Sequence, residues 1–316
     1  MQRFKKILLA LEPEPEDLTA LLRAITLVRQ NRASLHVLVV LDHLPLEELP
    51  LGARTLIGIL DQDKLRDVIV RRQRVRLQNA LSALSTEDLD VSTSVEWSHT
   101  PFLTIVHRVL RHGHDLLIKA AEHVTGPKAV LFHPTDRHLM RKCPCPVWMM
   151  RPERHATYRR ILAAVDSFPD DESNNALNRQ ILELANSQAV RDEAELHLVH
   201  AYHIGSKALL PTDFDVEEYR KAVAALHRER LEALLAGYSI PRQSTHLVEG
   251  LPGEVIPEVA RRERIDLIVM GTLARVGIPG LFIGNTAERT LDHAECDILA
   301  VKPKGFVTPV RLPEQD

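Results

Sequence analysis

The sequence is poor in several features that mark specialised classes of protein. It has only three cysteines in 316 residues, and aromatic residues make up 4% of the chain. An odd, small set of cysteines is a poor disulfide framework and is typical of a reducing compartment. Apolar runs such as residues 37–41 are far shorter than the roughly 18 residues that suggest a membrane span.

The first residues do not form a targeting signal either. The short apolar run that ends at Ala10 is followed almost at once by Glu12 and a series of prolines and acids, which does not fit a signal peptide. We therefore expect a cytoplasmic protein that has no membrane partner.

The chain also lacks an excess of either charge. Forty basic residues stand against 43 acidic ones, so that the formal net charge is -3. Such a balance provides no strong field for a polyanion, and we do not expect nucleic acid as a partner. Hydrophobic residues make up 45% and charged residues 26%, which is the composition of a soluble globular protein.

What the sequence does contain is an internal repeat. The segment 3–12 is matched by 157–166, and each has basic residues, then an apolar run, then an acid. Three further segments recur in the same order, beginning at Ala33 and Ala194, at His114 and Ile265, and at Cys145 and Cys296. These collinear matches predict two domains of about 150 residues each, 1–152 and 153–316.

Each copy alternates short apolar runs with helical patterns, which indicates βαβ units. In the second copy we expect strands at 161–165, 196–201, 244–248, 266–270 and 298–301, and helices at 175–185, 216–235, from 253 and at 286–293. The pattern predicts an α/β protein of two tandem domains, each with a doubly wound parallel sheet of five strands.

Ligands of such sheets bind where strands end, at the switch in strand order. After the strand 266–270 the chain runs through a glycine-containing segment to Gly284, and a helix follows. Glycine lets the backbone approach an anion closely, and the first turn of a helix attracts phosphate. No Gly-Lys-Ser/Thr sequence is present, so this is not a Walker loop. The alternative is purely structural, because Asn285 and Glu288 also form a capping-box-like pair.

This segment resembles the signature of the universal stress protein family, Gly-x2-Gly-x9-Gly-Ser/Thr/Asn. Gly271 matches its first glycine, Ala274 stands at the second, and Gly284 with Asn285 and Thr286 closes it. Longer runs, 134–148 and 250–257, also resemble the tandem-domain members of that family. The methyl group of Ala274 departs from the pattern and would crowd a phosphate.

The resemblance implies an adenine nucleotide alpha hydrolase-like fold in which some members bind ATP. It also implies that the two copies pack as an intrachain pseudo-dimer through strands 146–150 and 298–301, which we expect at sheet edges. By position, the nucleotide would meet Val165, Asp166, Ala201, Met270, Gly271, Ala274, Gly284, Asn285 and Thr286. From the residues alone, Asp166 equally suits a turn.

The first copy differs at these positions. An offset of 151 places Ala120, His123 and His133 at the glycine-type positions, and Pro134 replaces Asn285. Side chains then occupy space that backbone would leave to a phosphate, and proline removes an N–H donor. Glu12, longer than Asp166, disturbs the site further. We expect the first domain to be a structural partner that binds no triphosphate.

Two groups of metal-ligating residue types remain. Cys143 and Cys145 with His133 and His138 offer a zinc site as an alternative, although Pro144 between the thiols favours small buried residues entering a strand. The other group is the histidines of the first copy, for which no acid or thiol lies at ligand spacing: His107, His112, His114, His123, His133 and His138. We expect surface histidines and no metal ion of the protein's own.

These observations favour a stress-response protein that binds ATP, a related adenine nucleotide or another phosphate-bearing small molecule in its second domain. The local sequence suggests no catalytic triad, so we expect a binding module, with slow ATP hydrolysis or autophosphorylation as a lesser alternative. Two other readings stay open. One is a scaffold that forms a homodimer or recruits proteins through its sheet edges, and the other is an apolar or acyl-sugar ligand beneath the helix 216–235.

Overall fold

The computed structural model describes residues 4–13, 18–42, 62–120, 134–151, 157–167, 172–204, 215–272 and 285–313. The chain divides into two compact units. The described residues up to Arg151 form one unit, and Thr157–Val307 form the other. The C-terminal residues 308–313 belong to the first unit, whereas the sequence analysis assigned them to the second domain. There the hydroxyl of Thr308 donates to the carbonyl of Lys142 at 2.5 Å.

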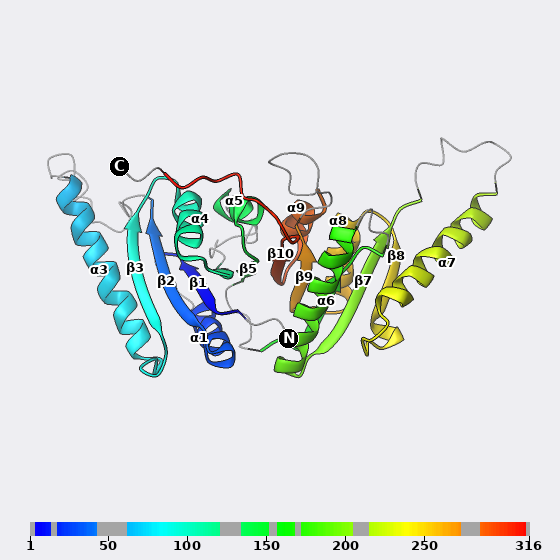
Figure 1. The fold of residues 1–316 in the computed structure, drawn as a ribbon, viewed down its shortest axis with the longest axis horizontal. Coiled ribbons are helices and arrows are strands. Elements are labelled where there is room, and N and C mark those ends of the chain that lie inside the picture. The colour runs from blue at the N-terminus through cyan, green and yellow to red at the C-terminus, as the bar shows by residue number, and fades with distance from the viewer. Residues whose placement is uncertain are drawn as a thin grey trace. The chain divides into compact units, whose positions relative to one another are not determined.

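The first unit is a parallel sheet with the strand order β3-β2-β1-β4-β5 (Figure 1). Its strands are β1 (Lys6–Leu11), β2 (Ser34–Leu41), β3 (Val91–Trp97), β4 (Leu116–Ala120) and β5 (Val147–Met150). Its described helices are α1 (Thr19–Asn31), α3 (Gln62–Ser82), α4 (Pro101–His112) and α5 (Pro134–Lys142).

The second unit repeats this topology with the order β10-β9-β6-β7-β8, again all parallel. Its strands are β6 (Arg160–Ala164), β7 (Glu195–Tyr202), β8 (Thr245–Glu249), β9 (Leu267–Gly271) and β10 (Asp297–Val301). Its helices are α6 (Glu172–Asp192), α7 (Val216–Leu234), α8 (Pro252–Arg262) and α9 (Asn285–His293), and a short 3-10 turn, η3 (Arg242–Ser244), precedes β8.

The structure confirms the predicted strands of the second copy to within one residue at each end. The predicted helix at 175–185 was too short, because α6 runs on to Asp192. The polar residues after Ala185 hid this continuation, yet Ser187, Gln188 and Ala189 are buried against the fold. As predicted, β5 and β10 each end the strand order of their own unit.

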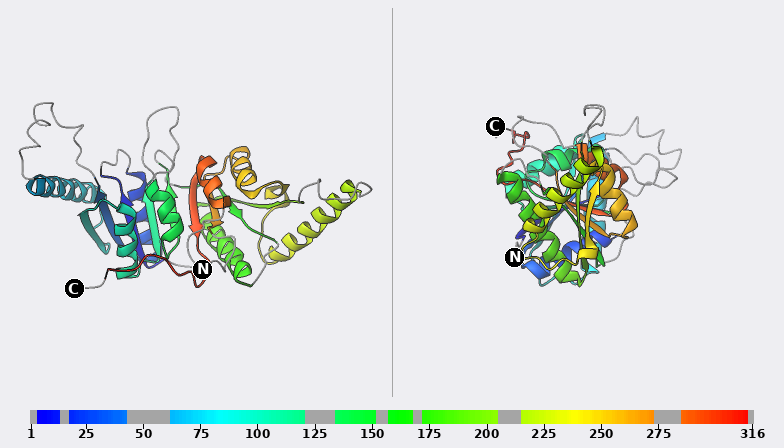
Figure 2. Two further views of the ribbon diagram at one scale, coloured as in Figure 1. Left: turned by 90° about the horizontal axis from the view of Figure 1, so that it is seen from above. Right: turned by 90° about the vertical axis from the view of Figure 1, so that its right-hand side faces the viewer.

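Helices cover both faces of the second sheet. Figure 2 shows α8 and α9 on one face and α6 and α7 on the other. Because both faces are covered, strands such as β10 are buried along their whole length and do not alternate with polar residues. Close packing of α8 on α9 explains Gly253, where an added Cβ would lie 2.8 Å from the Cβ of Arg289. Among the described helices, none is long and apolar enough to cross a membrane.

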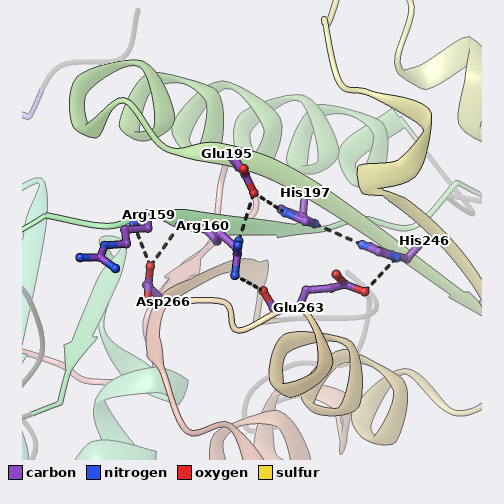
Figure 3. A network of polar contacts seen from close by, with 7 residues as sticks. All are labelled: Arg159, Arg160, Glu195, His197, His246, Glu263 and Asp266. Carbon is purple, nitrogen blue, oxygen red and sulfur yellow. Dashed lines mark hydrogen bonds and ion pairs between the residues drawn. The ribbon is translucent and has the colours of Figure 1, made fainter.

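The two units also share individual hydrogen bonds at equivalent positions. Asp115 accepts from the backbone N–H groups of Lys5 and Lys6, at 2.7 and 3.0 Å. Asp266, 151 residues later, accepts from the same two groups at the start of β6, those of Arg159 and Arg160, also at 2.7 and 3.0 Å (Figure 3). Asp115 therefore links the residues just before β4 to the start of β1. Asp266 links the residues just before β9 to the start of β6 in the same way.

The two aspartates differ in one detail that a substitution should expose. A single oxygen of Asp266 accepts both bonds, whereas Asp115 uses one oxygen for each. Alanine at either position should lower the free energy of unfolding by about 1–3 kcal/mol, because two donors lose their acceptor. Asp266→Asn should cost clearly less than Asp115→Asn in urea unfolding, since one amide oxygen can replace one carboxylate oxygen but not two. Equal losses for the two asparagine variants would contradict this account.

Candidate functional site

The switch in strand order of the second unit lies between β6 and β9. Ala164, the last residue of β6, pairs with Met270 of β9 on one side and Val199 of β7 on the other. The predicted residues Val165, Asp166, Ala201, Met270 and Gly271 therefore lie at one carboxyl edge of the sheet. Helix α9 begins at this edge, because it runs back to the start of the parallel strand β10.

The backbone at Asp166 is held by a buried side chain from α6. The amide oxygen of Asn178 accepts from the N–H of Asp166 at 3.0 Å, and its amide nitrogen donates to the carbonyl of Asp166 at 2.5 Å. Both backbone groups are thereby satisfied without secondary structure, so the backbone position does not depend on the carboxylate. The side chain of Asp166 is exposed, as a ligand-facing carboxylate would be.

A buried histidine supports the next residue. Nδ1 of His200 lies 3.1 Å from the N–H of Ser167 and 3.1 Å from the carbonyl of Val165. Its Nε2 lies 2.8 Å from Nδ1 of His227 on α7, and the ring of His227 stacks on Tyr202. The sequence analysis missed this connection because the residues come from three separate segments.

Gly271 has a packing role of its own. An added Cβ would lie 2.8 Å from Cδ2 of Leu177 on α6, so glycine lets this helix approach the end of β9. The following residue, Thr272, is buried and its N–H donates to the carbonyl of Val301 on β10 at 3.0 Å. The glycine is thus explained by helix packing even before any ligand is considered.

The structure describes only some of the remaining predicted residues. Asn285 is the first residue of α9, and Thr286, which follows it, is half-buried. Ala274 and Gly284 lie outside the described residues, as do His123 and His133 of the first copy and the side chain of Asn285. The capping pair proposed for Asn285 and Glu288 therefore stays a prediction.

In the first unit, charged side chains occupy the corresponding carboxyl edge of the sheet. Lys119 occupies the place of Met270, since it pairs with Ala10 as Met270 pairs with Ala164. Its ammonium group donates to Glu12, which corresponds to Asp166, and lies 3.5 Å from the carboxylate of Asp136. The side chains of Lys119 and Asp136 are 5% and 1% exposed. An ion cluster therefore occupies the end of the first sheet.

Burial by itself would lower the pKa of Lys119, but the carboxylates of Asp136 and Glu12 outweigh it and hold the pKa above its ordinary value. The lysine is therefore charged, and so needs both acids. The sequence analysis found Glu12 but missed Lys119 and Asp136. A lysine inside the apolar run of β4 was the signal that could have revealed them.

Among the described residues of the first copy, the cysteines and histidines form no group of three ligand atoms close enough for a metal ion, although the rings of His112 and His114 lie 5.9 Å apart. The sulfur atoms of Cys143 and Cys145 lie 3.5 Å apart and both residues are buried just before β5, in agreement with the structural reading. The ring of His138 stacks on Phe102, with centroids 4.3 Å apart. His107 contacts the carbonyl of Arg311 at 3.0 Å.

Comparison with known proteins gives one consistent result. The model of the "Universal stress protein family" matches residues 3–151 and again 157–302. Universal stress protein E of Salmonella typhi is 31% identical over 319 residues, with 100% of both chains covered. Universal stress protein E of Escherichia coli K12 is also 31% identical, over 100% of this chain and 99% of its own.

Solved structures agree on the fold. A functionally unknown protein, PA1789 of Pseudomonas aeruginosa PAO1, has a TM-score of 0.73 and 28% identity, and the match covers 95% of this chain and 93% of that one. A universal stress protein from Archaeoglobus fulgidus has a TM-score of 0.60 at 14% identity, covering 94% of this chain and 98% of its own, and shows the fold alone.

The ion cluster of the first unit yields a stability prediction. Lys119→Met leaves the buried carboxylate of Asp136 without its cation, and should lower the free energy of unfolding by about 3–5 kcal/mol in urea unfolding. The double variant Lys119→Met, Asp136→Ala copies the second unit, where Met270 and Ala287 stand at these positions. It should recover much of the loss. A double variant as unstable as the single one would contradict the cluster's role.

The histidine beside Asp166 yields a pH prediction. Burial lowers the pKa of His200, an effect to which His227 adds and which the Val165 carbonyl and Asp166 oppose. The unfolded chain then binds more protons below pH 6.5, so the free energy of unfolding should fall as pH drops from 6.5 toward the lowered pKa.

Urea unfolding at pH 7.5 and 5.5 measures this fall. His200→Asn should reduce it, and the same substitution at His203, which is exposed just after β7, should not. An unchanged fall in the His200→Asn variant would show that this imidazole does not contribute to it.

Proposed function

The chain belongs to the universal stress protein family, and from this premise we propose that it acts in the stress response by binding an adenine nucleotide such as ATP in its second domain. The proposal concerns binding and not catalysis. It rests on the different chemistry of the two copies at the same edge of the same fold.

The observation that carries the proposal is the ion cluster of the first unit and its replacement in the second. Lys119 and Asp136 fill the carboxyl edge in the first unit. The second unit has Met270 and Ala287 at these places, which bring no charge, and an exposed Asp166. An edge that has no buried ion cluster and lies beside a helix N-terminus can accept an anionic ligand, whereas an edge that holds such a cluster cannot do so without breaking it.

The start of α9 supplies the phosphate end of the proposed site. Helix α9 has nine residues and begins at the carboxyl edge. The first N–H groups of a helix lack partners within it, and its dipole favours negative charge there. These groups and the signature that ends at Thr286 support phosphates at α9 and an adenosine near Asp166 and Ala201. Nucleotide occupancy would then change the surface that the protein presents to partners.

We propose the cytoplasm as the compartment. All three cysteines are free, although the sulfur atoms of Cys143 and Cys145 lie 3.5 Å apart. Three cysteines in 316 residues are a poor disulfide framework, which supports a reducing compartment.

The two copies supply a matched pair of substitutions. Thr286 and Thr135 are 151 residues apart, and each is the second residue of its helix and half-buried. Glutamate is tolerated in the first turn of a helix, so neither Thr286→Glu nor Thr135→Glu should prevent folding. A carboxylate beside phosphate should cost at least about 1.4 kcal/mol, which is tenfold in affinity.

Equilibrium binding of labelled ATP to the full chain tests the proposal. Thr286→Glu and Gly284→Glu should each weaken binding at least about tenfold, and Thr135→Glu should leave it unchanged. Loss of binding in Thr135→Glu alone would place the nucleotide in the first domain. Absence of ATP binding by the wild-type chain would remove the proposal.

A further inference from the structure

A second polar group lies at the opposite, amino edge of the second sheet. His197 is near the start of β7, His246 is near the start of β8, and Glu263 directly follows α8. Figure 3 shows these three side chains directed toward one another. One potential ligand atom from each lies within 4.8 Å of the others, and this is the only such group found among the described residues.

The two imidazoles are held in register. Their rings are nearly parallel, 3° apart with centroids separated by 5.6 Å, and Nδ1 of His197 lies 3.3 Å from Nε2 of His246. A carboxylate oxygen of Glu263 lies 4.0 Å from Nδ1 of His246. The parallel strands β7 and β8 position the two histidines. Leu198 pairs with Thr245, and His197 and His246 are the residues next to this pair.

One nitrogen of this group is buried without a hydrogen bond. Nε2 of His197 has no partner within hydrogen-bond distance, and its side chain is only 8% exposed. The nearest acid, Glu195, is 3.6 Å away. Glu195 therefore pairs with Nε2 from the side of the ring away from His246, and Nδ1 is the nitrogen that faces His246.

We propose that His197, His246 and Glu263 bind a divalent transition-metal cation of the zinc class, with water as the fourth ligand. Two imidazoles and one carboxylate form a donor set that zinc accepts, whereas magnesium and calcium require oxygen ligands. The sequence analysis expected no metal and examined only the cysteines and the first copy.

Two arginines surround the group and act differently. Arg160 donates to the carboxylate of Glu195 at 3.1 Å and to the backbone carbonyl of Glu263 at 3.3 Å, so it orients the acid of Glu195 and holds the backbone of Glu263. Arg262 competes with a cation, because its Nε donates to Glu263 at 2.8 Å and its terminal nitrogen lies 3.2 Å from His246. The Arg262 side chain is 51% exposed, so it can turn into solvent when a metal ion binds.

The first unit provides an internal comparison. His36 of β2 occupies the place of His197, but serine stands where His246 would be: Leu38 pairs with Ser94 as Val199 pairs with His246. Both nitrogens of His36 are satisfied, at 2.8 Å from the hydroxyls of Ser92 and Ser94. Arg108 also donates to Ser94 and Glu96 beside this histidine. A satisfied imidazole next to a fixed guanidinium is a poor metal ligand, so the first unit should not share the site.

Zinc binding to the full chain tests the inference, with competition against a fluorescent zinc chelator as the measurement. The wild-type chain should bind one equivalent. Loss of an outer-shell partner typically costs 10–100-fold in metal affinity, so His197→Ala and His246→Ala, which remove direct ligands, should each cost at least about 100-fold. His36→Ala, the matched substitution in the first unit, should leave affinity and stoichiometry unchanged.

Arg262→Ala should act in the opposite direction. An exposed ion pair contributes roughly 0.2–1 kcal/mol, so removing the competitor for Glu263 should tighten zinc binding by up to about fivefold. A purely structural role for the cluster predicts no such gain. Weaker binding in Arg262→Ala would overturn the assignment of Glu263 as a ligand.

Cobalt keeps the proposal testable if a histidine variant fails to fold. The wild-type chain with one equivalent of Co²⁺ should show the visible absorption bands of a low-symmetry nitrogen and oxygen site. Absence of these bands, no zinc binding by the wild-type chain, or unchanged binding in a folded His246→Ala variant would each overturn the proposal. Because this site lies at the amino edge, its failure would not affect the proposed nucleotide site.

Discussion

Parallel pairing of the strands is the constraint on which the rest of the structure depends. In each unit every strand points the same way, so all carboxyl ends meet at one edge and all amino ends at the other. Residues distant in sequence are thereby brought together twice, at two separate edges. The helices that return the chain must cover both faces, which makes the strands apolar and leaves chemistry to the residues at their ends.

The two copies use the carboxyl edge for different purposes. A buried lysine is stable only with counter-ions, and the first unit supplies them as Glu12 and Asp136 around Lys119. This cluster fills the edge of the first sheet with paired charges. The second unit instead fixes the backbone at Asp166 through Asn178 and has the uncharged Met270 and Ala287 in place of Lys119 and Asp136. Duplication makes such divergence tolerable, because one copy can keep a site that the other has filled.

The amino edge carries both the shared and the divergent features of the repeat. Asp115 and Asp266 make the same pair of backbone hydrogen bonds in the two units, since both folds must tie the loop to the first strand. A few residues away, His36 is satisfied by two serines, whereas His197 faces a second imidazole and an acid. His246 in place of Ser94 therefore replaces a hydroxyl that satisfies an imidazole with a second imidazole beside Glu263.

The sequence by itself determined the duplication, the class of fold and the strands of the second copy, because these follow from local periodicity and from self-similarity. It also located Asp166, Met270 and Gly271 at the ends of strands. Only the tertiary structure decided which side chains meet. The ion cluster of Lys119 combines residues over 100 positions apart, and the His197, His246 and Glu263 group combines residues from two strands and a helix end. No local sequence pattern predicts these contacts, because strand register and helix packing create them.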